Sequence, residues 1–155
     1  MSNYKLYTHQ FYNERISALI STVEKLHKTL ARQEYVCHPL VKLLARLSKA
    51  TLTIIPHNPN HRDYLLKGEL AKFRRYKRGL QRFRLLFCFA NQPALIVYLY
   101  VNDTNHLRKD GDKNDPYEEF KALVQKGIFS HNPNDLVMRK WIRQHQPVTS
   151  KDQQL

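Results

Sequence analysis

The chain has 155 residues, 42% of them hydrophobic and 25% charged, which is typical of one globular domain with a real core. No stretch approaches the roughly 18 apolar residues of a membrane helix, and the N-terminus MSNYKLYTHQ lacks the apolar centre of a signal peptide. We therefore expect a soluble, cytoplasmic protein with a single domain over residues 1–146 and a disordered tail over 147–155. The net charge of +13 favours a polyanionic partner: nucleic acid, an acidic membrane surface or an acidic protein.

The first half of the chain predicts one strand and two helices. Residues 4–9 form a short strand, and apolar residues then recur at intervals near 3.6 from Phe11 to Leu30, which indicates an amphipathic helix. A second helix begins after Pro39, with leucines on one face and cations on the other. The two helices are expected to form a hairpin joined around residues 33–38. The segment PHNPNHRDY over residues 56–64 is expected to be a surface loop.

The period changes to two in the next segment. Three strand-like runs, AKFRRYKR, RFRLLFCF and ALIVYLYV, are separated by turns at residues 78–81 and 91–93, so they predict an antiparallel meander. Asp115 and Pro116 then provide the cap and first position of a helix that runs to about Gly127. A last short helix is expected within residues 132–146.

Eight cations and a single acid, Glu69, lie between positions 67 and 84. Such a cluster is typical of a nucleic-acid-binding surface rather than of an evenly solvated face. If the apolar residues of the meander pack on the helices, the opposite face of the sheet presents arginines together with Tyr98, Tyr100 and Asn102. Such a surface is suited to RNA, because its cations would bind phosphates and its aromatic rings would stack on unpaired bases. The two tyrosines fit equally well as half-buried aromatics of a strand.

Other chemistries find little support. Cys37 and Cys88 are isolated and are expected to be free thiols. His57 and His61 are four apart, but the intervening NPN makes a loop in place of the helix that would align them on a metal. The chain has four glycines and no phosphate-binding or nucleophile-elbow motif. We therefore expect neither a metal nor a nucleotide cofactor.

Two long stretches resemble the YhaV toxin family. They are FRRYKRGLQRFRLLF over residues 73–87 and IVYLYVNDTNHLRKDGDKNDPYEEFKALVQKG over residues 96–127. The resemblance implies an α+β, RelE-like fold, in which an antiparallel sheet packs on an N-terminal helical hairpin and further helices follow. It also implies the toxin of a type II toxin–antitoxin system that cleaves messenger RNA. The implied partner is a PrlF-like antitoxin with an AbrB-type DNA-binding module, through which alone the toxin would reach operator DNA.

The resemblance also implies site residues. By position, six residues match cations and a tyrosine of the family's sequence pattern, and we expect them to be catalytic: Arg75, Lys77, Arg82, Arg84, Arg108 and Tyr117. Five further residues are expected to bind RNA: Arg74, Tyr98, Tyr100, Asn102 and Lys109. The chain departs from the family pattern at four positions, of which Cys88 in place of an arginine is the one that removes a charge.

RNA carries its own nucleophile, so an enzyme needs only to deprotonate a 2′-hydroxyl, hold it in line, stabilise the phosphorane and protonate the leaving 5′-oxygen. No metal is required. Arg75, Arg82 and Arg84 are expected to hold phosphate, because guanidinium groups match phosphate oxygens but hardly ever lose a proton. Lys77, an amine among like charges, is the better candidate for proton transfer. Two alternatives stay open at this point: a non-catalytic RNA- or ribosome-binding module and, with less support, a membrane-surface protein.

Overall fold

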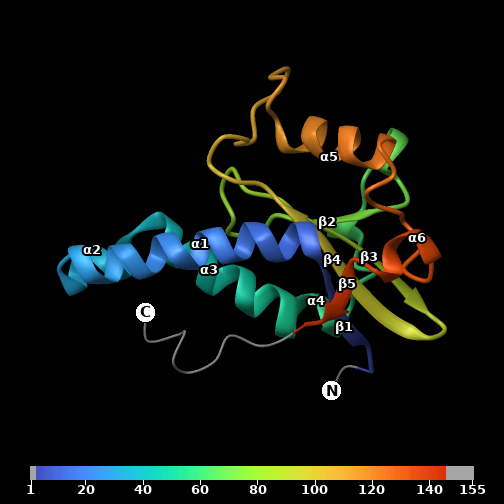
Figure 1. Cartoon of the computed structure of the whole chain (residues 1–155), viewed down its shortest axis with the longest axis horizontal. Helices are drawn as coiled ribbons and strands as arrows, with labels where there is room; N and C mark the ends of the chain where they lie inside the picture. Colours follow the sequence, from blue (N-terminus) through green and yellow to red (C-terminus); the bar gives the residue numbers. More distant parts are fainter. Residues whose placement is uncertain (1–2, 146–155) are drawn as a thin grey trace.

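The computed structural model describes residues 3–145, which form a mixed sheet with helices on both of its faces (Figure 1). The helices are α1 (Gln10–Thr29), α2 (Arg32–Cys37), α3 (Pro39–Lys49), α4 (Ile55–His57), α5 (Pro116–Gln125) and α6 (Leu136–Arg139). The strands are β1 (Lys5–His9), β2 (Arg74–Tyr76), β3 (Leu85–Asn91), β4 (Ala94–Val101) and β5 (Ile142–Gln144). A π-helical turn (Ala50–Ile54) joins α3 to α4, and two 3-10 turns (Arg62–Tyr64 and Gly68–Leu70) precede β2. No helix within the described residues is long and apolar enough to cross a bilayer.

The strands lie in the order β2-β3-β4-β1-β5. The predicted meander of β2, β3 and β4 is antiparallel, as expected. The prediction of an entirely antiparallel sheet was wrong, because β1 runs parallel to β4, with Leu6 opposite Ile96. The connection between these two strands is long and runs through α1 to α4 and then through β2 and β3. It permits the parallel arrangement, which a short turn could not. β5 pairs antiparallel with β1 and was not predicted, because three residues are too few to show an alternating pattern.

Both helices of the first half are present, but the connector between them contains the short helix α2 rather than a simple turn. Tyr12 of α1 and Leu43 and Leu47 of α3 are buried in a cluster with one face of the sheet. In the second half, α5 begins at Pro116 as predicted and is capped by the Asp115 carboxylate, which accepts from the Tyr117 amide. The predicted disordered tail, 147–155, lies outside the described residues.

Each face of the sheet is covered, which corrects one prediction from the sequence. The face with Leu85, Phe87 and Tyr98 packs on α1, α3 and α4, whereas Tyr100 packs in a second cluster with Phe120 of α5. In Figure 1, α3 and α5 accordingly lie on opposite sides of the strands. The side chains of Tyr98 and Tyr100 are 0% exposed, so they form no RNA-facing surface. Of the two interpretations of these tyrosines, RNA-facing or packed in the sheet, the structure agrees with packing.

Two histidines, the buried His9 and the half-buried His145, link stability to pH. His9 caps α1 by accepting from the Phe11 amide, and His145 contacts the Thr51 hydroxyl at 3.1 Å. Burial lowers the pKa of both groups below the ordinary value of about 6.5. The unfolded chain then binds protons more readily than the folded one. The contribution of these two histidines to the free energy of unfolding is therefore fully present above about pH 6.5 and is lost as the pH falls below that value.

We therefore expect the melting temperature to fall when the pH is lowered from 7.5 to 5.5. The melting temperature of the double variant His9→Asn/His145→Gln should fall by less over the same interval. Asparagine at position 9 keeps the ability to cap α1. Thermal melts of both proteins at the two pH values test this expectation. An equal or larger drop in the double variant would assign the pH dependence to other groups.

Candidate active site

A pocket of about 530 Å³ brings together most of the residues that were predicted to be catalytic. Its walls come from the segment before β2, from β2 itself, from the approach to β3 and from the start of α5. It is lined by Leu66, Lys67, Gly68, Glu69, Leu70, Arg75, Lys77, Arg84, Arg108, Tyr117 and Lys121. Five of the six predicted catalytic residues are therefore in one place, although Arg108 and Tyr117 lie far along the chain from the others.

Arg84 precedes β3 and is held from several sides. Its amide donates to the Asn102 Oδ1 at 2.7 Å, and its Nη1 donates to the carbonyls of Gln81 at 2.6 Å and Phe83 at 2.7 Å. These are neutral acceptors, so they orient the guanidinium without neutralising its charge. The buried Nε atom of Arg84 has no hydrogen-bond partner. A buried donor without a partner is costly. Arg74, which does not line the pocket, has the same feature.

Arg75, the middle residue of β2, shows the same feature. Its Nη1 donates to the Tyr117 hydroxyl at 3.3 Å and its Nη2 to the Asp63 carbonyl at 3.0 Å. Its Nε is also buried without a partner. Because the Tyr117 oxygen accepts from a guanidinium, the hydroxyl hydrogen of Tyr117 remains available to a ligand in the pocket.

Arg108 is fixed by acids on two sides. Its guanidinium donates to the Asp110 carboxylate and, at 2.6 Å, to Asp115 Oδ2, and it lies 5.2 Å from the centre of the Tyr117 ring. The pKa of Arg108 is raised, first by the hydrogen bond to Asp110 and further by Asp115. Arg108 can therefore supply charge to a reaction but no proton.

Asp115 organises this side of the pocket and was predicted only as a helix cap. Its side chain is 5% exposed. Besides binding Arg108, it accepts from the backbone amides of Lys109 at 2.7 Å and Tyr117 at 2.9 Å. A single carboxylate thus holds the loop, the first turn of α5 and one of the cations.

We expect Asp115→Asn to reduce cleavage by about 10- to 100-fold, because small displacements of charged groups cost this much. Asparagine still caps a helix, but its amide nitrogen cannot accept from Arg108 and the Lys109 amide as Oδ2 does, so the melting temperature should fall as well. The matched control is Asp135→Asn, since Asp135 caps α6 in the same way and does not line the pocket. Cleavage kinetics and thermal melts of both variants test this expectation. Equal cleavage rates in Asp115→Asn and Asp135→Asn would show that Asp115 serves only as the cap of α5.

Asn102 positions Arg84 from inside the protein, which corrects the prediction that it faces RNA. It is 3% exposed. Its amide nitrogen donates to the carbonyls of Arg82 at 3.2 Å and His106 at 2.6 Å, while its oxygen accepts from Arg84. It therefore ties the approach to β3 to the loop after β4.

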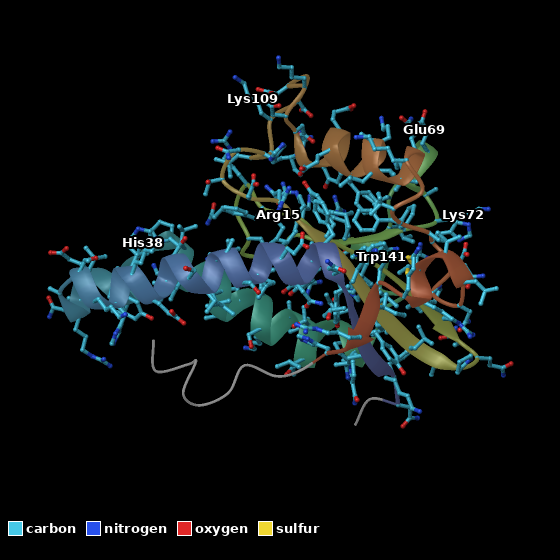
Figure 2. All side chains as sticks on the ribbon, viewed as in Figure 1. Arg15, His38, Glu69, Lys72, Lys109 and Trp141 are labelled. Atoms are coloured by element: carbon cyan, nitrogen blue, oxygen red, sulfur yellow. The ribbon has the colours of Figure 1, made fainter. Side chains whose placement is uncertain are left out.

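An ion network that the sequence did not reveal attaches α5 to the rest of the fold. Arg15 of α1 forms two hydrogen bonds with Glu119 of α5, at 2.6 and 3.3 Å, and also lies 3.6 Å from Asp103. The Tyr100 hydroxyl donates to the same glutamate at 2.5 Å. Figure 2 shows Arg15 between α1 and α5. No local pattern could have paired Arg15 with Glu119, because 104 positions separate them.

Several predicted residues do not line the pocket. Arg82 is exposed and donates from Nε to the Arg108 carbonyl at 3.1 Å, so it supports the loop. Arg74 binds the Ala71 and Phe73 carbonyls and lies over the Phe89 ring. Lys109 is exposed on the loop labelled in Figure 2. Conversely, Lys67, Glu69 and Lys121 line the pocket but were not predicted, although the basic cluster began at Lys67.

Metal chemistry finds no ligand set in the described part of the chain. Within residues 3–145, no group of three or more histidine, cysteine or acidic side chains is placed to hold an ion. Cys37 is exposed and Cys88 is buried, and neither forms a disulfide.

Comparison with known proteins identifies the family. The family model described as a toxin with endonuclease activity, of a toxin–antitoxin system, matches residues 6–140. The chain belongs to the YhaV toxin family. This chain is 31% identical over 140 residues to the ribonuclease toxin YhaV of Escherichia coli K12. The aligned region covers 87% of this chain and 88% of that protein. The YhaV toxins of the O157:H7 and CFT073 strains are equally similar, and no solved structure matches.

Membership in the YhaV family decides between the alternatives left open by composition. The matched region contains every residue that lines the pocket, from Leu66 to Lys121. The endonuclease activity of the family favours an enzyme over a module that binds without reacting.

Proposed function

We propose that this protein is a metal-independent endoribonuclease that cleaves messenger RNA and so stops translation and growth. The observation that carries the proposal is the pocket that brings Arg75, Arg84 and Arg108 together. Six cations line this pocket against one carboxylate, that of Glu69. Such a site suits an anion with several oxygens, as a phosphodiester has. The relative named a ribonuclease toxin supports RNA as the substrate.

In the proposed reaction the 2′-oxygen of RNA attacks the neighbouring phosphorus, and the bond from phosphorus to the 5′-oxygen breaks. Arg75, Arg84 and Arg108 hold the phosphate oxygens and stabilise the charge that develops on them. Lys77 and the Tyr117 hydroxyl are the groups that exchange protons with the 2′-oxygen and the leaving 5′-oxygen. The products are a 2′,3′-cyclic phosphate and a 5′-hydroxyl.

The RelE-like arrangement remains part of the proposal. It is supported by the α+β fold, by the antiparallel meander that carries Arg75 and Arg84, and by α1 and α3 packed against the sheet. The proposed inhibitor is a PrlF-like antitoxin with an AbrB-type DNA-binding module, supported by the family's place in toxin–antitoxin systems.

Inducible expression of the chain tests the toxin function. We expect growth to stop on induction, and to resume when the antitoxin encoded beside the toxin gene is co-expressed. Arg84→Ala expressed to the same level is the control and should permit growth. Normal growth with confirmed accumulation of the folded wild-type protein would contradict the proposal.

A further inference from the structure

The end of the described chain exposes apolar side chains that the catalytic pocket does not use. Leu136 is 74% exposed, Val137 56% and Trp141 41%. Within residues 3–145 six large hydrophobic side chains are exposed, and half of them lie between positions 136 and 141. Single exposed apolar residues need no explanation, but grouped ones indicate an interaction site.

This segment is firmly attached, so the exposure is not that of a frayed end. Met138 of α6 is 0% exposed within the second core cluster. The Gln10 amide donates to the Trp141 carbonyl at 2.7 Å, and β5 follows at once in register with β1. Trp141 lies at the junction of α6 and β5 (Figure 2). The anchored backbone therefore presents the apolar side chains in a fixed arrangement.

A second pocket, of about 460 Å³, adjoins Trp141. One wall is the start of α1, with Asn13 and Ser17, and the other is the chain from Lys140 to Arg143. It shares no residue with the catalytic pocket. A side chain from a partner could fill this space while neighbouring side chains cover Leu136 and Val137.

The border of this surface is positively charged. Arg139, Lys140 and Arg143 are exposed, and the Lys140 ammonium lies 5.2 Å from the centre of the Trp141 ring. The one acid that lines the second pocket, Glu14, accepts from Gln10 at 3.1 Å. An apolar centre with a cationic border is complementary to a segment that carries apolar and acidic side chains.

We propose that Leu136, Val137 and Trp141, with Arg139, Lys140 and Arg143, form the docking surface for an acidic amphipathic segment of the antitoxin. This inference rests on the proposed function, because it takes the antitoxin as the partner. It separates the docking surface from the catalytic pocket. Altering the surface should therefore yield a toxin that still cleaves RNA but escapes neutralisation.

The test compares two variants in vitro, with the antitoxin encoded beside the toxin gene as the probe. The apolar variant is Leu136→Ser/Val137→Ser/Trp141→Ala, and the charge variant is Arg139→Glu/Lys140→Glu/Arg143→Glu. The control is Val36→Ser, at an exposed apolar position in α2. Measurements are antitoxin affinity, RNA cleavage, thermal melting and molar mass in solution.

We expect affinity to fall about 100-fold or more in the apolar variant and about 10-fold or more in the charge variant, because central apolar anchors dominate interfaces. The control should bind normally, and all three should cleave RNA within about threefold of wild type, a difference of under about 1 kcal/mol. The charge variant changes only exposed side chains, so it tests the surface even if the apolar variant is unstable.

Three outcomes would overturn the inference. Unchanged antitoxin affinity in both variants would show that the antitoxin docks elsewhere. Loss of a wild-type dimer in the apolar variant, with antitoxin binding intact, would assign the surface to a second copy of this chain. A wild-type toxin that the antitoxin does not bind would overturn the proposed partner as well. If the antitoxin bound the wild-type protein and lost affinity for both variants, but the wild-type protein did not cleave RNA, the docking surface would be supported. Only the proposed ribonuclease function would then be contradicted.

Discussion

Replacing Arg84 with alanine is expected to reduce RNA cleavage about 100- to 1,000-fold, the usual cost of removing one charged donor to a transition state. The guanidinium lines the pocket, is oriented by two carbonyls and keeps its buried Nε without a partner. Its hydrogen bonds in the structure go to backbone oxygens, so no acid loses its counter-charge when it is removed. We expect the change in the free energy of unfolding to be about 0.5 kcal/mol or less. That corresponds to a shift in melting temperature of about 2 °C or less for a chain of this size.

The matched control for this experiment is Arg78→Ala. Arg78 belongs to the same basic cluster, is exposed, pairs with Asp63 and does not line the pocket. Its loss should leave cleavage within about threefold of wild type. If Arg84→Ala retained activity at that level, Arg84 would not belong to the site. A collapsed melting temperature would mean instead that Arg84 is required for folding.

Replacing Tyr100 with alanine is expected to destabilise the fold by about 3–5 kcal/mol, the usual cost of truncating a fully buried aromatic side chain. The ring is 0% exposed, stacks on Phe11 at 5.7 Å and meets Phe120 edge-on at 5.5 Å. Its hydroxyl also donates to Glu119, which would lose that partner. The melting temperature should drop by roughly 6–20 °C.

The control for Tyr100→Ala is Tyr117→Ala, a tyrosine that lines the pocket and is only half-buried. Tyr117→Ala should lower cleavage with a much smaller loss of stability. Thermal melts and cleavage rates of the two variants separate a packing role from a role at the site. A stable Tyr100→Ala protein that binds RNA weakly would restore the interpretation of Tyr100 as an RNA-facing residue.

The burial of Tyr100 shows where the sequence misled. The alternation around Phe83, Leu85 and Phe87 predicted one covered face, yet Leu86 and Cys88 between them are also apolar and also buried. The run ALIVYLYV is nearly continuous in apolar residues, which is typical of a strand covered on both faces. What covers the second face, α5 with Phe120, comes from a distant part of the chain. Local periodicity cannot report such a contact.

The candidate site was more predictable than the sheet, for a physical reason. Arg75, Lys77 and Arg84 lie close together in sequence, so the charge cluster indicated their region, and the family resemblance selected them from its eight cations. Arg108 and Tyr117 were expected only through the family resemblance, because their approach to β2 depends on Asp115 and on the network between Arg15 and Glu119. The supporting residues left no local signal, since their partners lie far along the chain.

The central claim is tested most directly by incubating the purified, folded protein with defined RNA in the presence of EDTA and analysing the ends of the fragments. The account predicts cleavage without added metal, with 2′,3′-cyclic phosphate on one fragment and a 5′-hydroxyl on the other, and loss of both with Arg84→Ala. Cleavage only with added Mg²⁺ to leave a 5′-phosphate, or no cleavage by the folded protein, would contradict it.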